Sequence, residues 1–196
     1  LCEQILRKFP DNAENGKVYA NWGSALDDMG NRDEAIKIYS KGIKKYPDAS
    51  LLYLNRGITY YLQQHPDEAA EDMKIVIELK PTHASAHLYL GYSVYQKNRM
   101  AAVLSLSAFL MLERQGARAA KNLQLLGKLL SSNVERKDEK NITISLSPPA
   151  KKHKGPDDFS AQEMLISFAA ALDYDEKNKN LDAAQKLKNK LESFCG

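Results

Sequence analysis

The sequence predicts an all-α fold in which antiparallel helix pairs follow one another along the chain. The tripeptide Asp-Glu-Ala occurs at 33–35 and again at 67–69, which is an offset of 34 residues. The same offset relates three glycines, Gly23, Gly57 and Gly91, and two prolines, Pro47 and Pro81. A repeated unit of this length is typical of proteins that stack one supersecondary motif many times.

Each copy of the repeat carries two amphipathic helical stripes. In the first copy, apolar side chains recur at spacings of three and four, as Tyr19, Trp22, Leu26 and Met29, and then as Ala35, Ile36, Tyr39 and Ile43. Between the stripes Gly30 favours a left-handed helix stop, and Asn31 with Glu34 predicts a capping box. Pro66 fits the first position of the matching helix in the second copy. We therefore expect two helices per copy, with Pro47 or Pro81 ending the second one.

The three recurrent glycines lie inside predicted helices, where glycine costs up to about 1 kcal/mol relative to alanine. A costly residue at one place in every copy needs a structural reason. We expect the two helices of a pair to approach so closely there that a side chain would hold them apart. The large residue four positions earlier (Tyr19, Tyr53 or His87) is expected to fill the gap between neighbouring pairs.

This order of large residue, glycine, tyrosine, alanine, aromatic residue and proline resembles the tetratricopeptide repeat. The resemblance is closest over 16–49 and 50–83, and weaker over 84–117, where Val103 and Ser107 replace the usual alanine and aromatic residue. It implies a right-handed superhelical solenoid over 1–132, with a half repeat at 1–15 and a capping helix at 117–132. Because the chain opens with Leu1 and half a repeat, we interpret it as a fragment or a processed form.

The pattern changes after residue 132, and we expect a linker over 133–157. Its first part, 133–140, is charged and should be irregular, whereas 141–147 alternates like a short strand. A lone strand is unstable without a partner. Residues 158–196 predict a helical hairpin, with a capping box at Ser160 and Glu163 and a second helix over roughly 181–194. This hairpin either docks on the solenoid or begins a further domain that the chain truncates.

The sequence offers no recognisable catalytic, cofactor or metal site, and we expect a protein that is not an enzyme. It contains no glycine-rich phosphate loop, nucleophile elbow or paired zinc motif. His83 and His87 stand four residues apart, but no third metal ligand accompanies them. Cys2 and Cys195 are expected to be free thiols. No apolar run reaches the roughly 18 residues that a membrane-spanning helix needs.

The resemblance also implies where a partner binds, because in this family the first helix of each pair lines the concave groove. Our candidate partner-binding groove comprises Leu54, Asn55, Ile58, Tyr61, Leu88, Tyr92 and Tyr95. The matching helix faces also carry Lys17, Ala20, Ser24, Asp27, Asp28, Leu51, Leu62, Ser85 and Gln96.

Some members of the family clamp the terminal carboxylate of a peptide with two lysines, two asparagines and an arginine on these helices. The matching positions here hold Ala20, Ser24, Asn55, Ser85 and Tyr89. Only Asn55 fits the pattern, so we do not expect that kind of clamp.

We therefore predict a non-catalytic interaction or scaffold module that binds an apolar peptide or helix of a partner protein in this groove. Rigid aromatic side chains with a polar tip are common interface anchors. The alternative is a structural or regulatory arm of a larger protein, whose groove is filled in cis by its own C-terminal segment.

A third hypothesis, an adaptor for RNA or another anion, rests on Lys151, Lys152 and Lys154. No aromatic residue interleaves these lysines to stack on bases. With a net charge of only +3, we expect no nucleic-acid partner. The sequence leaves the identity of the partner, the oligomeric state and the compartment (cytoplasm or periplasm) open.

Overall fold

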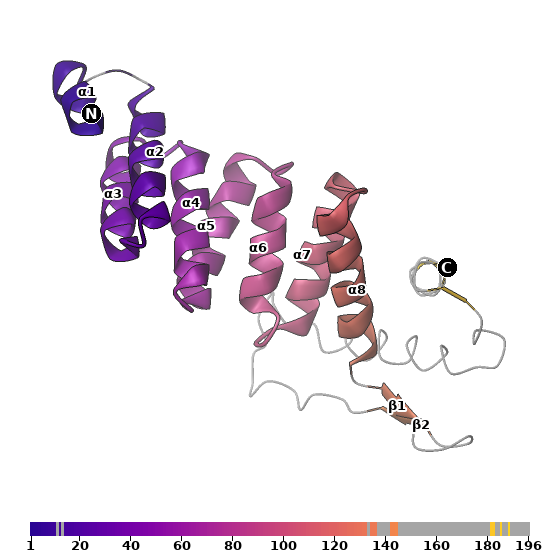
Figure 1. The fold of residues 1–196 in the computed structure, drawn as a ribbon. Coiled ribbons are helices and arrows are strands. Elements are labelled where there is room, and N and C mark those ends of the chain that lie inside the picture. Colours follow the sequence, from indigo (N-terminus) through magenta and orange to yellow (C-terminus); the bar gives the residue numbers. More distant parts are fainter. Residues whose placement is uncertain are drawn as a thin grey trace. The chain divides into compact units, whose positions relative to one another are not determined.

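The computed structural model describes residues 1–10, 12, 14–132, 134–136, 142–144, 181, 182, 185 and 188, and Figure 1 shows the fold. The chain divides into two compact units, Leu1–Lys97 and Asn98–Gly196. The boundary falls between the two helices of the predicted third repeat. None of the helices in the described ranges is long and apolar enough to cross a membrane.

The described part of the first unit is helical throughout. Its helices are α1 (Cys2–Lys8), α2 (Asn15–Asp28), α3 (Arg32–Lys45), α4 (Ser50–Leu62), α5 (Pro66–Leu79) and α6 (Ala84–Val94). Each helix packs against the next, and the first helices of successive repeats also touch, α2 against α4 and α4 against α6 (Figure 1). This confirms the all-α repeat solenoid that the sequence predicts.

The turns inside the two complete repeats have the same geometry. After α2, Gly30 adopts a left-handed φ of 83°, and the amide of Asn31 donates to the carbonyl of Leu26 over 2.8 Å. After α4, Gln64 adopts a φ of 66°, and the amide of His65 donates to the carbonyl of Tyr60 over 2.9 Å. Both are Schellman endings, which satisfy carbonyl groups that the last turn of a helix leaves unpaired.

The predicted close contacts within helix pairs are present at Gly23 and Gly57. A Cβ added to Gly23 would lie 2.3 Å from Cε1 of Tyr39, on the partner helix α3. One added to Gly57 would lie 2.5 Å from Cε of Met73, on α5. Both distances are far below van der Waals contact. A side chain at position 23 would meet the ring of Tyr39, whereas one at position 57 would have to displace the terminal methyl group of Met73. Gly91 is buried in α6, and a close approach at that position stays a prediction.

The core of the first unit gathers around these contacts. Tyr39 and Met73 are 1% and 0% exposed. Around Tyr39 the buried cluster comprises Tyr19, Ala20, Ala35, Ile38 and Leu52, and around Met73 it comprises Tyr53, Leu54, Val76 and Ala86. Tyr19 and Tyr53 are thus buried between helices as predicted, whereas His87 is only half-buried.

Gly42 adds a close contact that the repeat comparison did not predict. A Cβ there would lie 2.8 Å from Cβ of Tyr19 and 3.0 Å from Cδ1 of Leu52. Because Tyr19 lies on α2 and Leu52 on α4, this glycine lets α3 pack tightly against the helix before it and the helix after it. The position one repeat later is Val76, so comparing one repeat with the next did not indicate a close contact at Gly42.

Two local predictions in the first repeat are wrong. Asn31 occupies the N-cap position of α3, but its side chain makes no capping hydrogen bond, so the predicted capping box with Glu34 is absent. Its backbone amide is already committed to the Schellman ending of α2. Met29 is 65% exposed rather than part of the apolar face, because α2 has ended at Asp28.

Predictions about helix ends made from proline are confirmed. Pro66 is the first residue of α5. The helices α3 and α5 end at Lys45 and Leu79, each followed by one capping residue and then by Pro47 or Pro81. A residue before proline avoids helical dihedral angles, which ends the helix at a defined place.

A buried ion pair ties α4 to α5. Nε of Arg56 donates to Oδ2 of Asp72 over 2.9 Å, and Nη2 donates to Oδ1 over 2.7 Å. Nη1 donates to Oγ of Ser40 on α3 over 2.9 Å, so one side chain joins three helices. Burial raises the pKa of Asp72, and the hydrogen bonds from Arg56 oppose that effect. The Asp72 side chain is only 4% exposed.

The described part of the second unit contains α7 (Arg99–Leu112), α8 (Ala117–Ser131) and two short strands, β1 (Val134–Arg136) and β2 (Ile142–Ile144). The helices α7 and α8 pack together. Leu126 and Leu130 of α8 are buried, at 3% and 2% exposed. Whether α8 caps a stack of repeats stays a prediction.

The expectation that 133–140 is irregular is wrong, because β1 lies within it. β1 and β2 pair antiparallel, with Val134 opposite Ile144 and Arg136 opposite Ile142. The predicted strand over 141–147 therefore has the partner that an isolated strand lacks. The first helix of the predicted C-terminal hairpin, the lysines at 151, 152 and 154, and Cys195 lie outside the described residues.

The second predicted C-terminal helix starts later than residue 181. Leu181 and Asp182 are not helical, whereas Gln185 and Lys188 are. The amide of Gln185 donates to Oδ1 of Asp182 over 2.8 Å, and the amide of Asp182 donates to Oε1 of Gln185 over 3.2 Å. This reciprocal pair is a capping box, which marks the beginning of a helix.

The glycine contacts predict the effect of adding one methyl group. Gly23→Ala should lower the free energy of unfolding by about 1–3 kcal/mol, because the buried ring of Tyr39 has little room to move away. Gly127→Ala is the matched control, since nothing lies within 4 Å of a Cβ built at Gly127 in α8. Helix propensity should then raise the free energy of unfolding by up to about 1 kcal/mol. Urea unfolding of both variants measures this, and stabilisation by Gly23→Ala would contradict the contact.

The buried ion pair predicts a large loss of stability when its acid is neutralised. Asp72→Asn should lower the free energy of unfolding by about 3 kcal/mol, because the Arg56 cation would stay buried without a counter-charge. Glu71→Gln on the same helix is the control. Its carboxylate pairs with Lys74 at the surface, where such pairs contribute at most about 1 kcal/mol. Similar thermal unfolding midpoints for the two variants would show that the buried pair is not a major stabilising contact.

Candidate functional site

The first helices of successive repeats are in contact, α2 with α4 and α4 with α6. The side of these helices that carries the candidate groove residues is named here the first-helix face. Aromatic side chains meet where α4 adjoins α6. The ring centroids of Tyr61 and Tyr92 are 5.9 Å apart and stacked, with an interplanar angle of 28°. The structure thus brings together two residues that the sequence places in one groove.

Tyr89 joins this cluster, although the sequence analysis named it only as a mismatch to the carboxylate clamp. Its ring lies 5.6 Å from that of Tyr61 and 6.0 Å from that of Tyr92, edge-on to both. Edge-to-face and offset-stacked rings are the favourable arrangements of aromatic pairs. The spacing of three residues between Tyr89 and Tyr92 was the sequence signal that could have identified it.

The phenol groups of the cluster influence one another. Burial raises the pKa of Tyr61, and the neighbouring Tyr92, Tyr95 and Tyr89 raise it further. Tyr95 therefore lies close to the cluster as well, and its hydroxyl accepts a hydrogen bond from Nε2 of Gln96 over 2.9 Å. Tyrosine is neutral at physiological pH, so Tyr61 presents an apolar ring with a polar tip.

The candidate residues differ in how much surface they offer. Leu54 and Leu88 are only 8% and 3% exposed, because they pack into the floor between helices. Asn55, Ile58, Tyr61 and Tyr92 are half-buried, and Tyr95 is 42% exposed. On the same face, Leu51 and Leu62 are 41% and 46% exposed. The accessible apolar surface therefore comes mainly from residues at the ends of α4 and α6.

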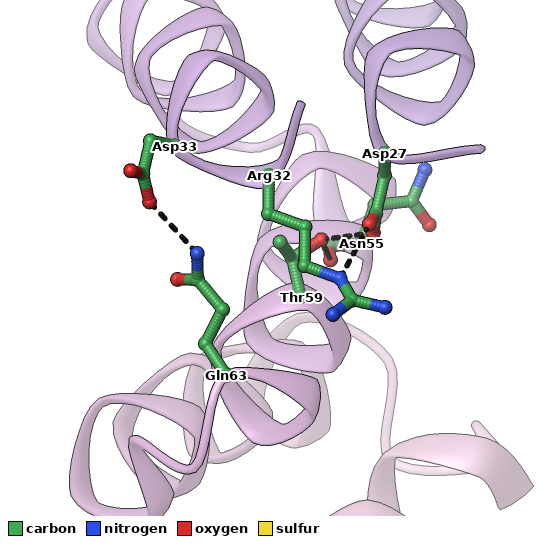
Figure 2. A network of polar contacts seen from close by, with 6 residues as sticks. All are labelled: Asp27, Arg32, Asp33, Asn55, Thr59 and Gln63. Carbon is green, nitrogen blue, oxygen red and sulfur yellow. Dashed lines mark hydrogen bonds and ion pairs between the residues drawn. The ribbon is translucent and has the colours of Figure 1, made fainter. Parts of the chain in front are cut away.

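A polar network fixes the end of α2 against α4, as Figure 2 shows. Oγ1 of Thr59 donates to Oδ2 of Asp27 over 2.6 Å and lies 3.0 Å from the backbone carbonyl oxygen of Asn55. Nε of Arg32 donates to the other carboxylate oxygen of Asp27 over 3.2 Å. Burial, together with the Asp27 carboxylate, raises the pKa of Tyr39 to about 12. The carboxylate of Asp27 is thus held by side chains from two other helices.

A hollow of about 600 Å³ lies beside this network. It is lined by Leu26, Gly30, Asn31, Arg32, Asp33, Glu34 and Gln63. Nε2 of Gln63 donates to Oδ1 of Asp33 over 2.7 Å (Figure 2), and Lys37 pairs with Glu34 over 3.1 Å. The acidic side chains of the hollow are therefore bonded within the chain.

The described residues bring together no group of three histidine, cysteine, aspartate or glutamate side chains that could hold a metal ion. Nε2 of His87 lies 2.8 Å from the carbonyl oxygen of Pro81, so this ring is engaged with the preceding turn. Cys2 is a free thiol in α1.

Comparison with known proteins shows what the repeats are similar to. The tetratricopeptide-repeat family model matches residues 21–82 and 58–102. A curated relative, the STIP1 homologue of Dictyostelium discoideum, is 27% identical over 89 residues. That match covers 45% of this chain and 16% of the relative, so the chain corresponds to a small part of the longer protein.

Solved structures share the fold. The first tetratricopeptide domain of Spaghetti (RPAP3), bound to the HSP90 peptide SRMEEVD, has a TM-score of 0.56 at 24% identity and covers 61% of this chain and 98% of that domain. The first tetratricopeptide domain of human RPAP3 has a TM-score of 0.57 at 24% identity, covering 62% and 96%. At this level of identity the likeness establishes the fold alone.

Proposed function

Because residues 21–102 of this chain are tetratricopeptide repeats, we propose that it is a non-catalytic protein interaction module whose first-helix face binds an apolar peptide or helix of a partner protein. The observation that carries the proposal is the apolar surface of this face. Leu51, Leu62 and Tyr95 are each more than 40% exposed, and Leu62 directly follows Tyr61 of the tyrosine cluster. Aromatic residues with a polar tip recur at the energetic centres of protein interfaces.

The solved domain of Spaghetti is bound to the HSP90 peptide SRMEEVD, in which acidic residues outnumber basic ones. The positions that hold a terminal carboxylate in peptide-clamping members of the family carry no cation here, since Ala20, Ser24, Ser85 and Tyr89 occupy four of them. Ala20 is also fully buried. This chain therefore lacks the charge that an acidic tail needs, and burial of apolar surface is the main source of affinity that its face offers.

The alternative, in which the C-terminal segment of the chain fills the face in cis, uses the same apolar surface. It makes a different prediction about binding in the full-length chain, because the face would be occupied until that segment is removed.

Two matched leucines test the proposal. Leu62→Ser at the end of α4 should reduce capture of partner proteins by full-length protein at least fivefold, because it removes apolar contact from the proposed interface. Leu79→Ser at the end of α5 is the control, since Leu79 is 41% exposed and lies on a second helix of a repeat. Quantitative mass spectrometry of proteins retained by immobilised protein measures the effect, with circular dichroism to confirm the fold.

Equal losses in both variants, or no loss in either, would contradict a binding site on the first-helix face. If neither variant changes capture until residues 133–196 are deleted, the face is filled in cis and the alternative holds.

A further inference from the structure

Resting on the proposed function, we infer that the partner segment is basic as well as apolar. An apolar or aromatic side chain of the partner packs against the tyrosine cluster and Leu62, and a neighbouring lysine or arginine pairs with Asp28. The inference names the charge of the partner, which the fold alone leaves open.

The cations of the first-helix face are already neutralised within the chain. The basic side chains on or beside α2, α4 and α6 and their acidic partners are Lys17 with Glu14, Arg32 with Asp27, and Arg56 with Asp72. An acidic partner would therefore have to displace an internal pair or leave its own charge unmatched. A charge that faces a like charge, or no counter-charge, across an interface weakens binding, and this disfavours an acidic partner.

Asp28 is the acidic side chain that remains. It is exposed at the last position of α2, and no ion pair or hydrogen bond joins its carboxylate to another residue in the described ranges. A negative charge at the C-terminal end of a helix opposes the helix dipole, and the neighbouring carboxylate of Asp27 adds like-charge repulsion. A cation from a partner would relieve both effects.

Asp28 and Leu62 occupy equivalent positions of the 34-residue repeat, at the ends of α2 and α4, and these two helices are in contact. The hydrogen bond from Thr59 to Asp27 holds the end of α2 against the last turn of α4. That turn carries Tyr61 and Leu62. An apolar side chain and a basic side chain that are close together in a partner segment can therefore meet Leu62 and Asp28 at once.

The tyrosine cluster favours the same chemistry. The faces of aromatic rings carry partial negative charge and attract the cations of lysine and arginine. The ring centroids of Tyr61, Tyr89 and Tyr92 lie within 6.0 Å of one another, so the face offers several electron-rich rings to a basic side chain of the partner. Aromatic rings and one unpaired carboxylate together select an apolar and cationic segment over an acidic one.

The experiment uses random decapeptides displayed on phage and selected on the immobilised full-length chain. The selected sequences are then made as fluorescein-labelled peptides for anisotropy titrations. We expect them to combine apolar residues with lysine or arginine. Asp28→Asn should weaken their binding about fivefold or more, whereas Glu78→Gln, which removes an exposed carboxylate from α5, should change it less than about twofold.

A double-mutant cycle measures the interaction between Asp28 and the basic residue of the peptide. Replacing the basic residue of the peptide by glutamine should weaken binding to the wild-type chain, but have little further effect on the Asp28→Asn variant. Peptides that lose affinity with Leu62→Ser but are acidic, or are indifferent to Asp28→Asn, would overturn the basic-partner inference and leave the proposed function standing. Selected peptides that are indifferent to Leu62→Ser would overturn both.

Discussion

The close approach of the two helices in each pair is the constraint on which the rest of the first unit depends. At Gly23 and Gly57 the backbone of the first helix lies directly against a large buried side chain of the second. Because no side chain separates the helices there, the ring of Tyr39 and the thioether of Met73 fill the centre of their clusters. A densely packed interior cannot deform without strain, so these contacts fix how the two helices of a pair are placed.

The first-helix face follows from this packing. The second helices pack against the first helices, and α2 contacts α4, which in turn contacts α6. The first-helix face is therefore built from neighbouring helices. Two polar side chains then join neighbouring helices through specific hydrogen bonds, in addition to the apolar packing. Arg56 joins α3, α4 and α5, while Asp27 joins α2 to α4. The tyrosines of α4 and α6 are therefore presented by a scaffold whose helices are held in register.

Much of this organisation was predictable from the sequence, because its signals repeat. The 34-residue offset predicted the helix pairs, and the prolines predicted where helices end. The resemblance to the tetratricopeptide repeat placed Tyr61 and Tyr92 on adjoining helices of one face. Features that occur in only one copy gave no such signal: Gly42 has Val76 as its counterpart, and Gln64 takes the left-handed conformation that glycine has at position 30.

Other differences have local physical causes. A side-chain cap was expected from Asn31, but the tight Schellman ending of α2 already fixes the backbone at that residue. Leu54 and Leu88 share the face predicted for a partner, yet they form its floor and are buried. Periodicity shows which face of a helix a residue occupies, but the depth of a residue on that face depends on how closely the neighbouring helix approaches.

The most direct measurement is a nuclear Overhauser cross-peak between the ε-methyl of Met73 and the α-protons of Gly57 in the full-length chain with isotope-labelled methionine methyls. The chain has only five methionines, so each methyl signal is resolvable. Met73 Cε lies 2.5 Å from the position that a Cβ of Gly57 would take, and the account therefore predicts a strong cross-peak. A Met73 methyl that contacts other residues but not Gly57 would contradict the helix packing on which the binding face depends.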